Sequence, residues 1–320
     1  MGPRIVFVNP HINEDQKKRI SLVADKYGAS IAFYSSTSPA ISNLADAEIV
    51  YGSSPELIEH APNIKWFCAA SAGIDNYVKS GVFEGRDILL TNSSGAFGLT
   101  IAEYIIMMSL YMMRRMPEYD KFIREKVWTG YMPIKNLKDS NIVVLGTGDL
   151  GSAFAKRVRA FEPKSLIGVS KSGNPVEHFD RVVKTDDLND VVSDVDLLVM
   201  CLPGTPETTG ILSRELIDRM PDSAYVVNVG RGSAVDEDAL VSALKEGRLA
   251  GATLDVLRTE PLPPESPLWD VPNLYITPHI SGQETTDWTK DKNYDMFAED
   301  LENYLSGNPL VYLADIRKGY

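Results

Sequence analysis

The chain has 320 residues, of which 44% are hydrophobic and 24% charged, and its formal net charge at pH 7 is −12. This composition is ordinary for a folded globular protein, and the length predicts two domains. The negative charge argues against nucleic acid as a partner, because the phosphates would be repelled. It does not exclude a small anionic substrate, since a local arginine or helix N-terminus can dominate the charge of a pocket.

Cysteine usage and the length of the apolar segments favour a cytoplasmic protein. Cys68 and Cys201 lie far apart in apolar, strand-like runs, so we expect buried thiols in a reducing compartment. The N-terminal apolar run of four residues is too short for a signal peptide. The most apolar helical segment, TIAEYIIMMSLYMM, contains Glu103 and is shorter than the roughly 20 residues that span a bilayer. We therefore expect no membrane association.

The first hundred residues alternate β-rich runs with helical stretches. Strands are expected at RIVFVN, SIAFYSS, AEIVYG, IKWFCAAS and DILLTNS. Between the first two, apolar residues recur at helical spacing at Ile20, Val23 and Ala24, and this helix is expected to end at Gly28. The alternation predicts a parallel sheet with helices on its faces.

A long helix is expected next, at about residues 98–116. Thr100 and Glu103 have the spacing of a capping box at its start. Its methionines favour a packing surface, in the core or between subunits; they are Met107, Met108, Met112, Met113 and Met116.

The alternation restarts after a loop with proline and glycine, VWTGYMPIKNLKDS. The expected strands are NIVVLG, SLIGVS, RVVKT, DLLVMCLP, AYVVNVG, GATLDV and LYITP. The segment from residue 284 is expected to be helical as far as residues 306–309 and is too poor in apolar residues to form a domain alone. We therefore predict an α/β protein of two doubly wound parallel-sheet domains, a discontinuous one of residues 1–97 plus 284–320 and one of residues 98–283.

A glycine pattern, GTGDLG, separates the strand NIVVLG from a helical run. In a dinucleotide-binding turn Gly146 would form the bend, Gly148 would let the backbone approach a pyrophosphate, and Gly151 would let helix and sheet pack closely. The helix N-terminus adds partial positive charge for the phosphates. We expect this turn, with Asp149 and Leu150, to bind a nicotinamide dinucleotide.

The next strand ends where an NAD-binding protein places an acid on the ribose 2′-OH. Here Ser170, Lys171 and Ser172 stand at that point. Hydroxyls can donate to a phosphate and lysine adds positive charge, so these residues favour NADPH. The alternative is that Lys171 is a solvated loop lysine and that NAD binds without the usual acid.

Three polar residues follow strands of the second domain: Arg231, Glu260 and His279. Loops beyond the carboxyl ends of parallel strands line the ligand crevice, so the three can meet beside a nicotinamide. With a 2-oxo acid as substrate, arginine would grip the carboxylate, histidine would protonate the carbonyl oxygen, and the glutamate would orient the histidine. Taken singly, each could instead be a surface or capping residue.

Taken together, GTGDLG, VNVGRG, GATLDV, RTEPLPPESPLW and ITPHISG resemble the D-isomer-specific 2-hydroxyacid dehydrogenase family, over essentially the whole chain. Ser170 and Lys171, with PLPPESPLW and the C-terminal RKGY, are most similar to the glyoxylate/hydroxypyruvate reductase branch. The resemblance implies a flavodoxin-like substrate-binding domain, 1–97 plus 284–320, and a Rossmann dinucleotide-binding domain, 98–283, with the active site in the cleft between them.

The resemblance also implies roles for individual residues. Arg231 matches the substrate-binding catalytic arginine, Glu260 the acid paired with the histidine, and His279 the proton donor. Cofactor contacts are expected from Asp255, which matches the residue on the nicotinamide carboxamide, and from Leu202, Pro203, Val229 and Gly230. Backbone amides of Ala72 and Gly73 match the binding site of the substrate carboxylate. Helix 98–116 matches a dimer interface, and the loop with Trp128 and Tyr131 an aromatic segment near the substrate or a packed lid.

The sequence thus predicts a homodimeric reductase that converts small 2-oxo acids, glyoxylate or hydroxypyruvate, to D-2-hydroxy acids, with NADPH preferred and NAD as the alternative. Larger 2-oxo acids remain open as substrates, whereas a phosphorylated one would need more cations than Lys79 near residues 71–80. A further alternative is a dinucleotide sensor that uses the fold as a binding module. No metal site is predicted, because the histidines lack ligand spacing; they are His11, His60, His178 and His279.

Overall fold

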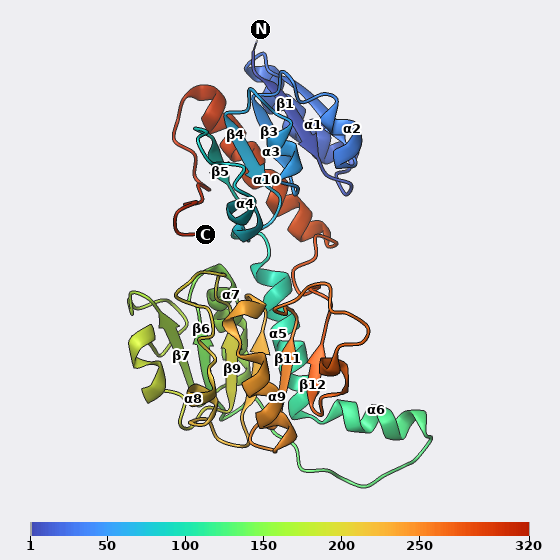
Figure 1. Ribbon diagram of the computed structural model, residues 1–320, viewed down its shortest axis with the longest axis vertical. Helices are drawn as coiled ribbons and strands as arrows, with labels where there is room; N and C mark the ends of the chain where they lie inside the picture. Colours follow the sequence, from blue (N-terminus) through green and yellow to red (C-terminus); the bar gives the residue numbers. More distant parts are fainter. Residues whose placement is uncertain (1, 320) are drawn as a thin grey trace. The chain divides into compact units, whose positions relative to one another are not determined.

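The computed structural model describes residues 2–319 and divides into two compact units (Figure 1). Unit 1 comprises Met1–Phe97 and Gln283–Tyr320, and unit 2 comprises Gly98–Gly282. The chain thus returns to unit 1 one residue before the position expected from the sequence. Each unit contains a wholly parallel sheet, so the predicted fold class of two doubly wound α/β domains is confirmed. The assignment of unit 1 to substrate binding stays a prediction.

Unit 1 is built on a five-stranded sheet of order β2-β1-β3-β4-β5, the flavodoxin-like order. Its strands are β1 (Arg4–Val8), β2 (Ser30–Tyr34), β3 (Ile49–Gly52), β4 (Trp66–Ala69) and β5 (Leu89–Thr91). Its helices are α1 (Glu14–Lys26), α2 (Thr37–Ile41), α3 (Glu56–Glu59), α4 (Asp75–Ser80) and α10 (Asp287–Ser306).

Both faces of the unit 1 sheet are buried. Along β1, Ile5 and Phe7 join a cluster formed with α1 and α10, whereas Val6 and Val8 join a second cluster with side chains of α2, α3 and α4. This alternation follows from the two-residue period of a strand. It explains why β1 reads as a continuous apolar run.

Helix α10, the returning segment, is tied to unit 1 by aromatic packing. The Phe297 ring lies 5.3 Å from Phe7 and 5.5 Å from Trp66, between ring centroids. The helix begins at the cap Thr286, whose side chain accepts a hydrogen bond from the Thr289 amide, and it ends at Gly307 in a left-handed conformation.

Unit 2 is built on a seven-stranded sheet of order β12-β11-β10-β9-β6-β7-β8. Its strands are β6 (Asn141–Leu145), β7 (Ser165–Ser170), β8 (Arg181–Lys184), β9 (Leu197–Met200), β10 (Tyr225–Asn228), β11 (Gly251–Leu254) and β12 (Leu274–Ile276). Its α-helices are α5 (Gly98–Met113), α6 (Met116–Arg124), α7 (Asp149–Val158), α8 (Arg214–Ile217) and α9 (Glu237–Lys245). Short 3-10 helices are η1 (Arg159–Phe161), η2 (Thr185–Asp190), η3 (Gly232–Ala234) and η4 (Pro267–Asp270).

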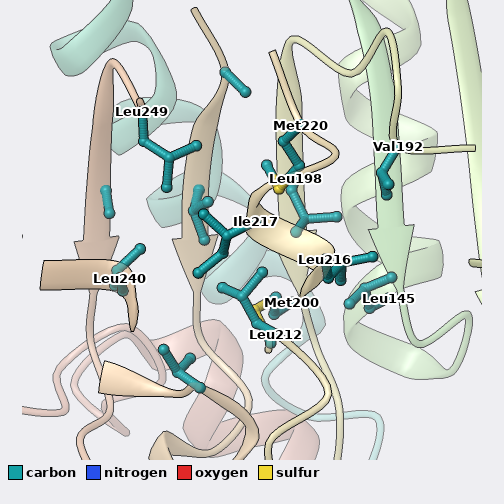
Figure 2. Close-up of a cluster of buried hydrophobic side chains, with 14 of the residues drawn as sticks. Leu145, Val192, Leu198, Met200, Leu212, Leu216, Ile217, Met220, Leu240 and Leu249 are labelled. Carbon is teal, nitrogen blue, oxygen red and sulfur yellow. The ribbon is translucent and has the colours of Figure 1, made fainter. Parts of the chain in front are cut away.

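The strand order of unit 2 reverses between β6 and β9, which marks the switch point where doubly wound sheets bind ligands. One face of the sheet carries α5 and α7 (Figure 1). On the other face, Leu198 and Met200 of β9 pack with Leu216 and Ile217 of α8 (Figure 2). This buried cluster fixes the strands whose carboxyl ends carry the candidate site.

The long helix expected at residues 98–116 is two helices. Helix α5 ends at Met113, Arg115 adopts a left-handed conformation with φ of 54°, and α6 begins at Met116. Pro117 stands in the first turn of α6, where its missing N–H is tolerated. Thr100 lies inside α5 rather than before it, so the predicted capping box is also wrong.

The methionines and cysteines divide between core and surface. Met108, Met112 and Met113 are buried, whereas Met107 is 54% exposed, so only part of the predicted packing surface is used within the unit. Cys68 is buried as expected. Cys201 is partly exposed; it directly follows the carboxyl end of the central strand β9.

Candidate functional site

The polar residues singled out in unit 2 follow three adjacent parallel strands. Arg231 comes after β10, Asp255 directly follows β11, and His279 comes after β12. These strands neighbour one another, with Asn228 opposite Leu254 and Leu254 opposite Ile276. Their carboxyl ends therefore lie at one edge of the sheet, as the sequence predicted.

Glu260 and His279 are brought into direct contact. The His279 Nδ1 atom lies 2.8 Å from Glu260 Oε2. The other carboxylate oxygen, Oε1, accepts a hydrogen bond of 2.7 Å from the Leu257 amide, which fixes the glutamate on its own loop. Because Nδ1 is engaged, Nε2 is the ring atom that is left for a ligand, and 52% of the His279 side chain is exposed.

The backbone of His279 is held in an uncommon conformation. Its φ of 54° lies in the left-handed region, which side chains other than glycine rarely adopt. The amide of His279 donates to the carbonyls of Asp255 and Thr277, each at 2.9 Å. These two hydrogen bonds hold His279 in a conformation that would otherwise be unfavourable.

Asp255 is buried and supports the same loop. Its Oδ1 accepts hydrogen bonds from Thr277 Oγ1 at 2.6 Å and from the Ile280 amide at 2.8 Å. Its Oδ2 accepts from the Ser281 amide at 3.0 Å. Its expected contact with the nicotinamide carboxamide stays a prediction.

The loop that bears Arg231 is shaped by Asn228. The Asn228 side chain accepts from the Gly230 amide at 3.1 Å and donates to the Arg231 carbonyl at 3.0 Å. A Cβ atom on Gly230 would lie 2.5 Å from the Leu202 carbonyl oxygen, so glycine is needed for the loops after β9 and β10 to pack. The guanidinium of Arg231 donates to the Gly230 carbonyl at 2.7 Å.

The glycine turn has the geometry of a dinucleotide-binding turn. Gly146 follows β6 with φ of 95°, and α7 begins at Asp149. A Cβ on Gly151 would lie 1.9 Å from the Gly146 carbonyl oxygen, whereas a Cβ on Gly148 would meet no atom of the described residues within 4 Å. The turn therefore packs tightly on one side and leaves space before the α7 N-terminus on the other. That space and the helix dipole suit a pyrophosphate.

The residues expected to read the ribose stand at the end of β7. Ser170 Oγ accepts from the Gly173 amide at 3.1 Å, and Ser172 Oγ accepts from the Asn174 amide at 3.2 Å. Neither hydroxyl donates a hydrogen bond to another described residue, so both protons are available to a ligand. Lys171 is exposed. Its charge also acts on Glu207, whose pKa is lowered by its own backbone amide, by Thr205 and by Lys171.

Ala72 and Gly73 lie after β4 in unit 1. Their carbonyl oxygens accept from Asn92 Nδ2 and Ser71 Oγ, respectively, at 2.8 Å each. Neither amide donates a hydrogen bond to another described residue. Their predicted role at a substrate carboxylate stays a prediction.

Sequence reasoning missed Tyr104 and Thr277, which join through their hydroxyls at 2.5 Å. Thr277 stands two positions before His279, a spacing that could have drawn attention to it. Tyr104 is 173 positions away on α5, and no local pattern links it to the site.

Within residues 2–319, no group of three or more His, Cys, Asp or Glu side chains is arranged to hold a metal ion. None of the helices that these residues form has the length and apolar character required to cross a bilayer.

A Rossmann-type sheet with a glycine turn, together with a histidine–glutamate pair at its ligand-binding edge, defines a nicotinamide dinucleotide-dependent oxidoreductase. Residues 106–281 match the family described as D-isomer specific 2-hydroxyacid dehydrogenase, NAD binding domain. The chain belongs to the D-isomer-specific 2-hydroxyacid dehydrogenase family, as the sequence predicted, and it is an NAD(P)-dependent enzyme.

Named relatives support this assignment. The chain is 35% identical to a glyoxylate reductase from Thermofilum pendens over 232 residues, which are 71% of this chain and 68% of that protein. It is 34% identical to a hydroxyphenylpyruvate reductase from Plectranthus scutellarioides over 264 residues, 81% of each chain. A crystal structure of a D-isomer specific 2-hydroxyacid dehydrogenase from Xanthobacter autotrophicus Py2, in complex with NADPH and MES, superposes with a TM-score of 0.83 at 26% identity and 100% coverage of both chains.

Proposed function

We propose that the enzyme reduces small 2-oxo acids, such as glyoxylate and hydroxypyruvate, to D-2-hydroxy acids with NADPH. The observation that carries this proposal is the His279–Glu260 pair on the loops that follow β11 and β12. Such a pair supplies an oriented proton at Nε2, which a carbonyl oxygen needs as it becomes a hydroxyl. The glyoxylate reductase of Thermofilum pendens supports the choice of substrate class.

In this proposal the residues divide the work. His279 donates the proton from Nε2, and Glu260 holds Nδ1 and stabilises the positive charge of the protonated ring. Arg231 binds the substrate carboxylate with its planar guanidinium. The bound nicotinamide supplies the hydride. A positioned acid of this kind contributes about 10²- to 10⁴-fold in rate.

The NADPH preference rests on the end of β7. Ser170 and Ser172 can donate hydroxyl protons to a phosphate, and Lys171 adds positive charge there. A carboxylate at this strand end would repel the 2′-phosphate. The NADPH-bound neighbour from Xanthobacter autotrophicus Py2 is consistent with this choice.

Steady-state kinetics with both reduced nicotinamides test the proposal directly. We expect glyoxylate and hydroxypyruvate to be reduced with a higher kcat/KM for NADPH than for NADH, and the product to be the D isomer where it is chiral. Turnover of neither acid would refute the substrate assignment. Equal or better use of NADH would refute the cofactor assignment alone.

Larger 2-oxo acids are the second candidate substrates, because a relative with 34% identity is a hydroxyphenylpyruvate reductase. The same assay with hydroxyphenylpyruvate separates the two. A kcat/KM higher than that for glyoxylate would favour the larger substrate.

We also propose that the enzyme is a homodimer. Trp128 and Tyr131 are fully exposed, and Ile123 of α6 is 65% exposed; large apolar side chains left exposed in this way favour association. Analytical ultracentrifugation would test this, and a monomer of 35.3 kDa at assay concentrations would contradict it. A cytoplasmic location stays a prediction.

A further inference from the structure

The loop that carries His279 is supported by a directed chain of hydrogen bonds. Thr277 Oγ1 lies 2.6 Å from Asp255 Oδ1, and the same Thr277 oxygen lies 2.5 Å from the Tyr104 hydroxyl. A threonine hydroxyl has one proton. Because Thr277 donates that proton to the carboxylate of Asp255, the proton between Thr277 and Tyr104 must come from Tyr104. The chain therefore runs from Tyr104 to Thr277 to Asp255.

Burial and protonation state fix the direction of each hydrogen bond between Tyr104, Thr277 and Asp255. Asp255 is 1% exposed and Tyr104 is 8% exposed. Burial raises the pKa of Tyr104, which keeps its hydroxyl protonated and able to donate. Asp255 accepts at both oxygens, from Thr277, Ile280 and Ser281. Water competes poorly for hydrogen bonds in so buried a setting, so each of them strongly constrains the loop.

The same loop imposes the left-handed backbone of His279. The Asp255 carbonyl accepts from the His279 amide, while the Asp255 carboxylate accepts from the next two amides, those of Ile280 and Ser281. Three successive N–H groups thus point at one residue. Rotation of the Asp255 carboxylate would break its hydrogen bonds with the Ile280 and Ser281 amides. The loop would then be free to move, and the His279 imidazole would move with it, away from its position against Glu260.

We propose that Tyr104 is a positioning residue for His279: its hydroxyl, acting through Thr277 and Asp255, holds the imidazole where it meets Glu260. The inference rests on the proposed role of His279 as proton donor. It gives helix α5 a part in catalysis although Tyr104 lies 173 positions from Thr277 in the chain. In this role Tyr104 acts through the loop, by way of its hydrogen bond to Thr277.

Tyr104→Phe removes the donor and keeps the ring. Thr277 is then left without its incoming hydrogen bond in a buried setting, and the loop gains freedom. We expect kcat for 2-oxo acid reduction to fall about 10-fold, because small displacements of a catalytic group are costly. The KM for NADPH should stay within about 2-fold, since the glycine turn is untouched and Asp255 keeps its hydrogen bonds from the Ile280 and Ser281 amides.

Tyr111→Phe is the matched control. Tyr111 lies two turns further along α5, and its ring packs edge-on against Tyr275 of β12 at 5.8 Å between centroids. Its hydroxyl forms no hydrogen bond with the described residues, so we expect kcat to stay unchanged. Equal losses of kcat in the two variants, or none in Tyr104→Phe, would overturn the proposal.

A second pair covers the case in which Tyr104→Phe does not fold. Thr277→Ser keeps the hydroxyl that relays the hydrogen bond, whereas Thr277→Val removes it at constant shape. We expect Ser to retain kcat and Val to lose it, with the Tyr104→Phe/Thr277→Val double variant no worse than Thr277→Val alone, because both act through one chain. Additive losses in the double variant would contradict the relay.

A readout without substrate separates this inference from the proposed function. The chain has four histidines, so the imidazole NMR signals of His279 can be assigned by comparison with His279→Ala. We expect these signals to shift or broaden in Tyr104→Phe and to stay in place in Tyr111→Phe. Failure of the wild type to reduce any 2-oxo acid would refute the function, whereas unmoved His279 signals in Tyr104→Phe would refute the relay.

Discussion

His279 and Glu260 are joined by a hydrogen bond of 2.8 Å between Nδ1 and Oε2, although they stand 19 positions apart in the chain. The two residues come from loops after neighbouring strands, so the parallel sheet rather than local sequence brings them together. The glutamate is itself anchored by the Leu257 amide. The ring is therefore oriented before any substrate binds, which is what an efficient proton donor requires.

His279→Ala should abolish the proton donor without disturbing the cofactor site. We expect kcat to fall by about 10²- to 10⁴-fold, while the Kd for NADPH, measured by fluorescence titration, remains close to that of the wild type. His60→Ala is the control, because His60 is an exposed histidine whose ring, among the described residues, bonds to the Glu56 carbonyl alone. Wild-type turnover by His279→Ala would show that another group delivers the proton.

Glu260→Gln should weaken catalysis through the histidine. The amide keeps an acceptor for Leu257 but removes the negative charge beside the imidazole. We expect a lower kcat, because the protonated ring has lost its counter-charge. Glu265→Gln, an exposed change in the same loop, should leave kcat alone. A wild-type kcat in Glu260→Gln would reduce Glu260 to a structural residue.

The parts of the site that the sequence predicted are those with a local signature. Gly146, Gly148 and Gly151 follow a buried strand and open a helix, and the structure places them in that turn. Glu260 and His279 follow strands, and in a parallel sheet that alone puts them at one edge. Fold class was predictable for the same reason, because alternating strands and helices leave few arrangements of the sheet.

The parts that escaped prediction depend on tertiary contacts. Tyr104 reaches Thr277 only because α5 packs against the sheet, and no spacing rule reports a contact over 173 positions. The break between α5 and α6 was missed because Arg115, which adopts a left-handed conformation, is not a residue type that usually ends helices. Thr100 and Glu103 have capping-box spacing, but the helix begins two residues earlier, at Gly98.

Lys171→Ala should change cofactor preference more than catalysis. A lysine that bonds a 2′-phosphate contributes a charge-assisted hydrogen bond, so its loss should raise the KM for NADPH about 10-fold. The KM for NADH, which has no such phosphate, should change little. Lys164→Ala serves as the control, because it also removes one positive charge but lies directly before the first residue of β7. Equal effects of Lys171→Ala on the two cofactors would contradict an NADPH-specific contact.

Two glycine substitutions in the turn should separate folding from binding. In Gly151→Ala the new Cβ would lie 1.9 Å from the Gly146 carbonyl oxygen, so α7 must shift, and we expect a loss of stability of about 1–3 kcal/mol or more in chemical denaturation. In Gly148→Ala the Cβ meets no described atom within 4 Å, and the φ of −72° suits alanine. This variant should keep its stability and lose NADPH affinity, because the methyl group enters the space proposed for the pyrophosphate. Tight NADPH binding by Gly148→Ala would place the phosphates elsewhere.

Glu284 should make the stability of the chain depend on pH. Its carboxylate accepts hydrogen bonds from Asn9 Nδ2 and Asn293 Nδ2, each at 2.8 Å. Burial nevertheless raises the pKa of Glu284 in the folded state, and the two amides, His11 and Lys290 only partly offset this effect. The folded chain therefore binds this proton more tightly than the unfolded chain does, and the contribution to stability is complete below the ordinary value near 4.5.

That contribution is lost as pH rises through the raised pKa of Glu284, so the free energy of unfolding should fall across this window by at most about 1.4 kcal/mol per pH unit. Glu284→Gln removes the titration, and rotation of the Asn293 amide would turn its buried Oδ1, which has no partner among the described residues, toward the new amide group. Glu284→Gln should therefore become more stable relative to the wild type as pH rises. Urea unfolding of both proteins from pH 4.5 to 7.5 measures this difference in unfolding free energy. Glu59→Gln, an exposed change on α3, should run parallel to the wild type. A pH-independent difference for Glu284→Gln would mean that burial does not govern this carboxyl.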